Sequence, residues 1–290
     1  MTRTQQFNRD RTVQPAVHCV LYTPGFSSGR IAAAARSSAS ALLFDLEDSV
    51  PKGRKPLARE LLSSWCKQPK GGGLRAVRIN ELRSLEYLYD LSCLLAIESH
   101  PDIVVLTMVT DAQEIEIVRH HFADGGYRPR MFVTIETTMA LERIDAIAAV
   151  SDGLILGSAD LAAQLGVDIS WDNMLYARQR IVHAAATYGI PAVDTACFHL
   201  DDDAELIKES QKAKELGFVG KAAVHPRQVD IITKIFQPTE AEIARAREIV
   251  ARAGEADGEI IRLDGNMIGP PFVIRAKKLL QSAALDRSVS

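Results

Sequence analysis

The sequence predicts a (β/α)₈ TIM barrel followed by a C-terminal helical extension, on three observations. Eight short apolar segments alternate with eight segments of helical periodicity between residues 17 and 236. Such alternation implies parallel strands joined by right-handed crossovers, and eight units in roughly 220 residues fit a closed barrel better than an open doubly wound sheet. No Gly-X-Gly-X-X-Gly follows the first strand, which weakens the alternative of a dinucleotide-binding fold.

The predicted strands are apolar runs, as expected for parallel strands that are buried on both faces. They cover residues 17–22, 41–44, 75–79, 102–106, 131–135, 153–156, 190–193 and 218–224. Each is followed by a segment with apolar residues at helical spacing. The predicted helices cover residues 30–37, 57–66, 85–97, a stretch that begins at Asp111, and then 141–150, 173–188, 204–216 and 231–235.

Three domains follow from this pattern. Residues 1–16 are polar and rich in arginine, without the apolar core of a signal peptide, and we expect a flexible tail. Residues 17–236 form the predicted catalytic barrel. Residues 237–290 contain predicted helices at 239–253 and 273–284 around a short strand at 260–263. Because the apolar residues of this extension need a surface to cover, we expect it at a subunit interface.

Composition excludes several classes of protein. The 290 residues are 47% hydrophobic and 24% charged, which is ordinary for a soluble globular protein, and the net charge of −3 predicts no attraction to nucleic acid or to a membrane surface. No apolar run approaches the ~20 residues of a membrane span. The four cysteines are scattered without metal-site spacing, so we expect neither zinc nor disulfides, and a cytoplasmic location.

Charged residues follow several predicted strands. The run at 41–44 is followed at once by Asp45, Glu47 and Asp48. Other polar residues at strand ends are Arg78, Asn80, Glu136, Asp160, Asp194 and His225. In a β/α barrel the carboxyl ends of the strands share one rim, where active sites form. We therefore expect these side chains to converge.

The residue types at this rim suggest a metal-assisted reaction. Glu136 and Asp160 offer hard oxygen ligands that suit Mg²⁺, which keeps several of its waters. The three carboxylates after the second strand could hold those waters. Arg78 carries a planar guanidinium that suits a substrate carboxylate. Metal and arginine together could bind a 2-oxo acid and polarise its carbonyl, as in carbon–carbon bond cleavage through an enolate.

Structural interpretations stand beside these functional ones. Glu136 and Asp160 could be ion-pair partners at the barrel mouth, and Arg78 could simply neutralise a neighbouring carboxylate. Asp45 could cap the following turn. His225 is favoured as a loop anchor. Lys221 on the eighth strand could suggest a Schiff-base mechanism, but the acidic cluster would raise the pKa of a nearby lysine and favours a metal.

Seven segments, in order, carry a family resemblance. They are Phe44-Asp45-Leu46-Glu47-Asp48-Ser49-Val50, Val77-Arg78-Ile79-Asn80, Ile135-Glu136-Thr137, Gly157 with Asp160-Leu161-Ala162, Gly189-Ile190-Pro191-Ala192-Val193-Asp194-Thr195, Leu216-Gly217-Phe218 with His225-Pro226, and Pro238-Thr239-Glu240. Together they resemble the citrate lyase β-subunit-like (CitE-like) family of the HpcH/HpaI aldolase/citrate lyase superfamily, which includes stand-alone citramalyl-CoA and malyl-CoA lyases.

The resemblance implies a homotrimeric TIM-barrel enzyme that uses Mg²⁺ to cleave CoA or acyl-carrier thioesters of 3-hydroxy acids. It implies Glu136 and Asp160 as metal ligands and Arg78 as the anchor of the oxo acid. Three basic residues are placed near the thioester or its phosphates, namely Lys55, Arg59 and Arg30. The spacing of Lys55 and Arg59 is also that of a solvated helix face.

The chain departs from the family pattern at three places. Ser27 stands where an arginine is common, with Arg30 three residues further on, and Thr107-Met108 replaces a common Pro-Lys. Gly269 stands where the family usually has an aspartate that moves a proton. We expect a metal-bound water held by Glu47 to replace that acid, in preference to Asp48 or Asp264.

The expected function is Mg²⁺-dependent cleavage of a 3-hydroxyacyl-CoA, with citramalyl-CoA as the best candidate, giving pyruvate and acetyl-CoA. One alternative is a citrate lyase β-subunit-like protein that acts on a citryl thioester with a carrier partner. Another is a degenerate relative without catalytic activity.

Overall fold

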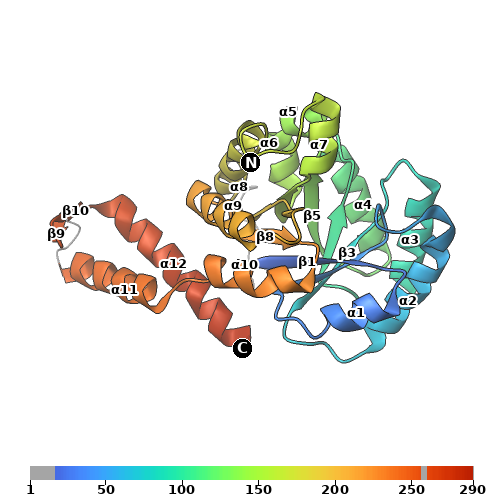
Figure 1. Ribbon diagram of the computed structural model, residues 1–290, viewed down its shortest axis with the longest axis horizontal. Helices are drawn as coiled ribbons and strands as arrows, with labels where there is room; N and C mark the ends of the chain where they lie inside the picture. Colours follow the sequence, from blue (N-terminus) through green and yellow to red (C-terminus); the bar gives the residue numbers. More distant parts are fainter. Residues whose placement is uncertain (1–16, 256–259, 290) are drawn as a thin grey trace. The chain divides into compact units, whose positions relative to one another are not determined.

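The computed structural model describes residues 17–255 and 260–289, and the predicted tail at 1–16 lies outside them. Eight parallel strands close into a barrel in sequence order, which confirms the predicted fold (Figure 1). The strands are β1 (Cys19–Pro24), β2 (Ala41–Asp45), β3 (Leu74–Arg78), β4 (Ile103–Leu106), β5 (Arg130–Ile135), β6 (Gly153–Leu156), β7 (Ala192–Asp194) and β8 (Gly220–Ala223). Residues 17–236 form one compact unit, and the residues from 237 onward belong to a second.

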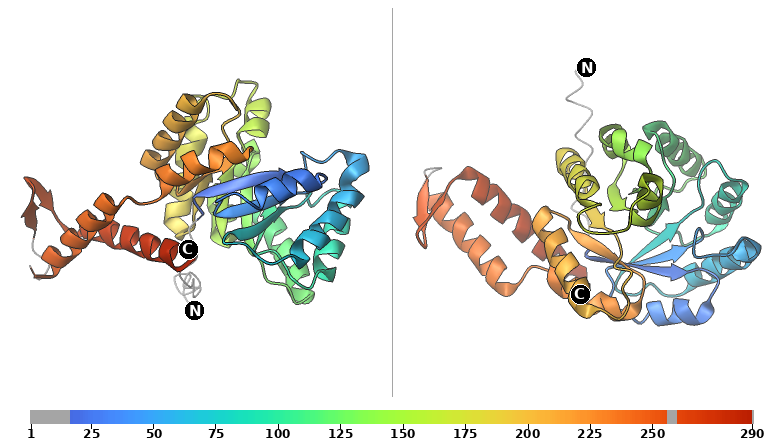
Figure 2. Two further views of the ribbon diagram at one scale, coloured as in Figure 1. Left: turned by 60° about the horizontal axis from the view of Figure 1, so that its bottom comes forward. Right: turned by 45° about the horizontal axis from the view of Figure 1, so that its top comes forward.

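Helices surround the strands of the first unit (Figure 2). They are α1 (Ser28–Ala34), α2 (Lys55–Lys67), α3 (Leu85–Ala96), α4 (Ala112–Asp124), α5 (Thr138–Glu142), α6 (Ile144–Val150), α7 (Ser158–Leu165), α8 (Leu175–Tyr188), α9 (Asp203–Leu216) and α10 (Val229–Phe236), with short 3₁₀ turns η2 (Lys52–Arg54) and η3 (Pro226–Gln228). The sequence prediction missed α7, which carries Asp160 on its first turn, and joined α5 and α6 into one helix.

The barrel interior is filled by side chains from every second residue of each strand. One buried cluster contains Val20, Leu43, Ala76, Val105, Phe132, Ile155 and Val193. Because side chains alternate between the two faces of a strand, the residue two positions further on each strand faces the same interior, one layer nearer the C-terminal rim. That rule places Tyr22, Asp45, Arg78 and Thr134 in one layer above the core.

The second unit is a helical hairpin. Its elements are α11 (Glu240–Glu255), the antiparallel strands β9 (Ile261–Leu263) and β10 (Asn266–Ile268), and α12 (Pro270–Val289), and the two helices pack against each other. The turn between the strands uses positive φ angles at Asp264 (47°) and Gly265 (79°). The sequence predicted the helices and the first strand but not β10. Among the described residues, no helix combines the length and the apolar character needed to cross a membrane.

Candidate active site

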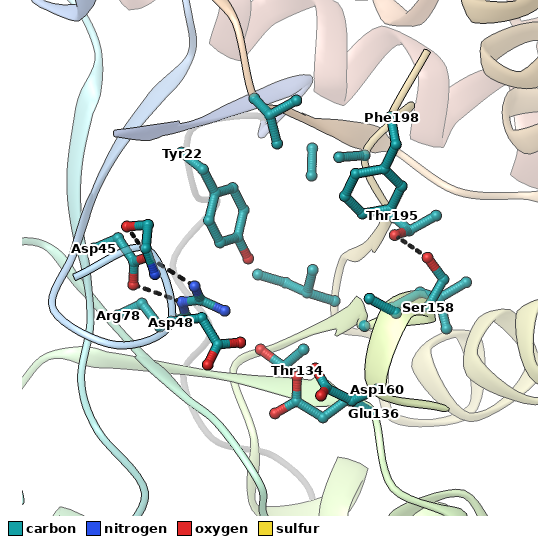
Figure 3. Close-up of a pocket in the computed structure, with 18 of the residues that line it drawn as sticks. Tyr22, Asp45, Asp48, Arg78, Thr134, Glu136, Ser158, Asp160, Thr195 and Phe198 are labelled. Atoms are coloured by element: carbon teal, nitrogen blue, oxygen red, sulfur yellow. Dashed lines mark hydrogen bonds and ion pairs between the residues drawn. The ribbon is translucent and has the colours of Figure 1, made fainter. Parts of the chain in front are cut away.

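A pocket opens at the C-terminal ends of the barrel strands, and its sides differ in chemistry (Figure 3). Charged residues on it are Asp45, Asp48, Arg78, Glu136 and Asp160. Its apolar lining includes Pro24, Ile155, Ala196, Phe198, Ala222 and Val224. Figure 3 shows Phe198 across the pocket from Arg78, with the phenol of Tyr22 between them. The charged residues at the ends of β2, β3, β5 and β6 thus meet at one rim, where the active sites of β/α barrels form.

Glu136 is a deeply buried carboxylate that faces this pocket. It directly follows β5 and is only 3% exposed. Its Oε1 accepts a hydrogen bond from the Met108 backbone N–H at 2.6 Å. Burial raises the pKa of Glu136 to about 7, although the Met108 amide and Arg78 lower it, and the charges of Asp160 and Asp48 raise it further. A bound cation would therefore find a carboxylate that lacks a neutralising partner.

Two backbone features fix the orientation of Glu136. Met108 has a φ of 52°, in the left-handed region that a non-glycine residue occupies at a cost of about 1–2 kcal/mol. Gly157 is equally constrained, because a Cβ there would overlap the Glu136 Cβ and lie 2.8 Å from its Oε2. Backbone strain held beside a pocket is typical of functional sites. These two constraints hold one carboxylate oxygen of Glu136 at the backbone amide of Met108.

Asp160 and Asp48 complete the acidic side. Asp160 is half-buried on the first turn of α7, and burial followed by the charge of Asp48 raises its pKa. Figure 3 shows Asp48 on the same side of the pocket as Glu136 and Asp160. Among the described residues, no group of three or more histidine, cysteine, aspartate or glutamate side chains is placed to enclose a metal ion. Two hard oxygen donors with raised pKa values fit Mg²⁺, whose other positions would go to water or substrate.

Arg78 is held in place before any substrate arrives. Its Nε and Nη2 donate to the two carboxylate oxygens of Asp45, each at 2.7 Å, and its Nη1 lies 3.1 Å from Glu47 Oε2. The ring of Tyr22 lies 5.2 Å from the guanidinium carbon. A guanidinium has five N–H donors, so two bonds to Asp45 leave others for a ligand. Both interpretations of Arg78 therefore apply, since it neutralises carboxylates and also lines the pocket.

Asp45 holds Arg78 and is itself held by the turn after β2. Its oxygens also accept hydrogen bonds from the backbone N–H groups of Glu47 and Ser49, at 3.0 and 3.1 Å, and from the Ser49 hydroxyl. Burial opposes its ionisation, but the charge of Arg78 and these hydrogen bonds hold the pKa of Asp45 below its usual value. Asp45 thus caps the turn after β2 and positions Arg78.

Comparison with known proteins places this geometry in a family. Residues 18–226 match the model of the HpcH/HpaI aldolase/citrate lyase family. The chain belongs to that family. It is 31% identical over 283 residues to the citrate lyase subunit beta of Escherichia coli K12, covering 92% of this chain and 93% of the relative. It is 27% identical to the mitochondrial citramalyl-CoA lyase of Rattus norvegicus, covering 91% and 85%.

Solved structures of the family agree. RipC from Yersinia pestis is 34% identical with a TM-score of 0.69, covering 80% of this chain and 99% of that one. CitE from Mycobacterium tuberculosis, in complex with magnesium, acetoacetate and coenzyme A, is 26% identical with a TM-score of 0.78, covering 93% and 98%. The resemblance predicted from sequence motifs is thereby confirmed.

Glu47 occupies a different place from the one its sequence position suggested. It does not line the pocket but lies beside Arg78, whose Nη1 is 3.1 Å from the buried Oε2 of Glu47. Burial, opposed by Arg78 and assisted by Asp48, raises the pKa of Glu47 to about 8. Of the two adjacent carboxylates, Asp48 is therefore the one open to a ligand.

The three basic residues expected near the thioester do not line the pocket. The Lys55 ammonium donates to the backbone oxygens of Leu46 and Glu47, at 3.0 and 3.2 Å, and to the Asn80 side chain. Arg59 pairs with Asp90 at 2.7 Å and also with Glu86. Neither is a solvated helix residue, because both tie α2 to neighbouring segments. Arg30 lies exposed on α1.

Two of the strand-end residues do not reach the rim, and for these the expected convergence was wrong. Asp194 is fully buried and pairs with Arg178 of α8 at 2.9 Å and with Lys221 at 2.8 Å. It follows Val193, an interior residue, so the alternation of side chains turns it outward. Asn80 instead donates to the Leu46 carbonyl oxygen and to Asp90. His225 caps η3, as the anchor interpretation expected.

The sequence prediction also missed pocket residues that alternation indicates. Tyr22, Thr134 and Thr195 each lie two positions beyond an interior residue, and all three line the pocket. The Thr195 hydroxyl lies 2.7 Å from that of Ser158. Phe198 lies on the loop after β7 and carries no such signal.

Proposed function

We propose that this protein is a Mg²⁺-dependent carbon–carbon lyase that cleaves a 3-hydroxyacyl-CoA thioester into a 2-oxo acid and acetyl-CoA. The observation that carries this proposal is the presence of Glu136, Asp160 and Arg78 in one pocket of a family fold. Relatives named as lyases, and a CitE structure that contains magnesium and coenzyme A, support it. Citramalyl-CoA, which would give pyruvate, is our best candidate.

Each residue has a task in this reaction. Glu136 and Asp160 would hold Mg²⁺, whose charge, when bound, stabilises negative charge on the substrate oxygen. The free N–H groups of Arg78 bind the carboxylate next to the hydroxyl-bearing carbon. Asp45 and Tyr22 keep the guanidinium oriented, so little ordering is required when substrate binds.

Asp48 moves the proton in this proposal. It takes the proton of the 3-hydroxyl as the ketone forms, and the electrons of the broken carbon–carbon bond pass to the acetyl thioester as its enolate. Asp48 then returns the same proton to the enolate carbon, so the hydroxyl proton ends in the methyl group of acetyl-CoA. General acid–base catalysis of this kind is typically worth ~10²–10⁴-fold. In this proposal Asp48 takes the part of the aspartate that the family usually has at the position of Gly269.

Assembly is a further part of the proposal. We propose a homotrimer in which the C-terminal extension lies at the subunit interface, and a cytoplasmic location. The second unit exposes Ile260, Met267, Phe272 and Ile274, and exposed apolar side chains in a group mark contact surfaces. Light scattering at micromolar concentration is the test, and a stable monomer contradicts this part.

The decisive experiment is an assay of the purified chain against citramalyl-CoA, malyl-CoA and citryl-CoA, with Mg²⁺ and with EDTA. We expect acetyl-CoA to be released from citramalyl-CoA in the presence of Mg²⁺ and not in the presence of EDTA. The Glu136→Gln variant should not release acetyl-CoA. Release from citryl thioester only when an acyl-carrier partner is added would favour the β-subunit alternative. No release from any thioester, by a chain that remains folded, would leave the degenerate binding protein as the explanation.

A further inference from the structure

Phe198 presents an apolar surface inside the pocket. It lies between β7 and α9, and 49% of its surface is exposed although it lines the pocket. Figure 3 shows its ring turned into the pocket, on the side away from Arg78 and Asp48. An exposed aromatic ring at this depth offers contact area to whatever occupies the pocket.

Two hydrogen bonds hold the segment that leads into Phe198. Before it, the Thr195 and Ser158 hydroxyls lie 2.7 Å apart, and both residues are buried. Next to it, the Cys197 carbonyl oxygen accepts a hydrogen bond from Gln228 Nε2 at 2.9 Å. The backbone is therefore anchored directly before Phe198, which supports the position of the ring, as a selective contact requires.

Charge is unevenly distributed over the pocket. Among the described residues that line it, Arg78 is the one cation, and it already pairs with Asp45. The neighbours of Phe198 in the lining are small or apolar, among them Ala196, Ala222 and Val224. An anionic group on this side would lose water without gaining a partner, which is strongly unfavourable.

We propose that Phe198 is a specificity-determining residue that receives the substituent on the hydroxyl-bearing carbon of the substrate. The ring accepts a small uncharged group there and rejects a carboxymethyl group. The preferred 2-oxo acids then carry one carboxylate, bound at Arg78, and an apolar tail. This inference rests on the proposed function, because it assumes that a 2-oxo acid binds between Arg78 and the acidic side.

Binding of the oxo acids separates the two claims. Isothermal titration with Mg²⁺ present would compare pyruvate, freshly dissolved oxaloacetate and 4-methyl-2-oxopentanoate, an isostere of oxaloacetate in which an uncharged isopropyl group replaces the second carboxylate. We expect the isostere to bind at least ~10-fold more tightly than oxaloacetate, since a mismatched tail in such a pocket typically changes affinity by that factor or more. Equal binding of the pair overturns the role of Phe198, and no binding of any of the acids overturns the proposed function itself.

Variants sharpen the test. Phe198→Arg adds a cation and is expected to improve oxaloacetate binding by at least ~10-fold while the isostere weakens. Phe198→Leu keeps an apolar side chain and should keep the original preference. Leu200→Ala is the matched control, because Leu200 lies on the same loop and is 42% exposed but does not line the pocket. A folded Phe198→Arg protein that still prefers the isostere, or a Leu200→Ala protein that loses the preference, contradicts the inference.

Discussion

Two buried charge clusters lie on the two faces of the same barrel wall, and they differ in how well their charges are matched. The outer cluster sets Asp194 and Glu209 against Lys221 and Arg178, with contacts of 2.8–3.1 Å. In the inner cluster, Arg78 is the cation that lines the pocket with the carboxylates Asp45, Asp48, Glu136 and Asp160. The outer cluster is closed to solvent, whereas the inner one opens on a pocket.

The pKa shifts have opposite signs in the two places. Burial opposes the ionisation of Asp194, but Lys221 and Arg178 hold its pKa below the usual value. Burial raises the pKa values of Glu136 and Asp160, and the charge of Arg78 offsets only part of that rise. A matched cluster fixes how strands and helices pack, while an unmatched one at a pocket is available to a ligand. Strand alternation decides which cluster Glu136 and Asp194 join.

The largest effect is expected from breaking the outer cluster. Asp194→Ala leaves two buried cations short of a partner and should lower the free energy of unfolding by about 3–5 kcal/mol. Urea denaturation measures it. The control is Asp160→Ala, which removes a half-buried pocket carboxylate and should not destabilise the protein. An Asp194→Ala protein as stable as the wild type would show that the outer cluster is not a stabilising element.

Next comes the proton carrier of the inner cluster. Asp48→Asn should lower turnover by about 10²-fold, the lower end of the range for general acid–base catalysis. Glu47→Gln changes the adjacent residue, which does not line the pocket, and should have a smaller effect. Steady-state kinetics on the substrate identified by the thioester assay decides between them. If the order is reversed, the result favours the hypothesis made from the sequence, in which a metal-bound water held by Glu47 moves the proton.

The unmatched charge should also appear in the pH dependence of stability. Glu136 has a pKa of about 7 in the folded chain against an ordinary value of 4.5, so the folded state holds its proton more tightly than the unfolded state. Stability contributed by that protonated form is lost as the pH rises through 7.

For the metal-free protein we therefore expect the free energy of unfolding to fall by about 2 kcal/mol between pH 5 and pH 8. Urea melts at the two pH values measure it. Glu136→Gln is the control that should reduce the fall and leave the part that comes from Glu47, whose pKa is raised to about 8. Mg²⁺ should reduce the fall, because it binds the ionised carboxylates. Asp194 does not contribute in this window, since its pKa is lowered. Stability that rises with pH would contradict the assignment of unmatched charge.

The same two clusters show what the sequence could and could not predict. Glu136 and Asp194 both stand at the ends of apolar runs, so both were expected at the rim. Alternation counted from Val193 would have turned Asp194 outward, and counted from Phe132 it gives Glu136 its inward position. Lys55 and Phe198 could not have been placed in this way. Their positions depend on loop conformation and on contacts with distant segments.

The smallest effect is expected from Arg78→Lys. Lysine keeps the positive charge that Asp45 requires. It loses the planar guanidinium, which binds Asp45 through two parallel N–H groups and still has other N–H groups for a substrate carboxylate. Activity should fall at least ~10-fold, which corresponds to about 1.4 kcal/mol of transition-state stabilisation. The free energy of unfolding should change by less than about 1 kcal/mol, since an ion pair with Asp45 can still form.

The reciprocal exchange in the outer cluster, Lys221→Arg, enlarges a fully buried side chain and should reduce stability while the turnover of the folded protein is unchanged. An Arg78→Lys enzyme of normal activity would remove Arg78 from substrate binding and leave it, like Arg178, as a structural partner of a buried aspartate.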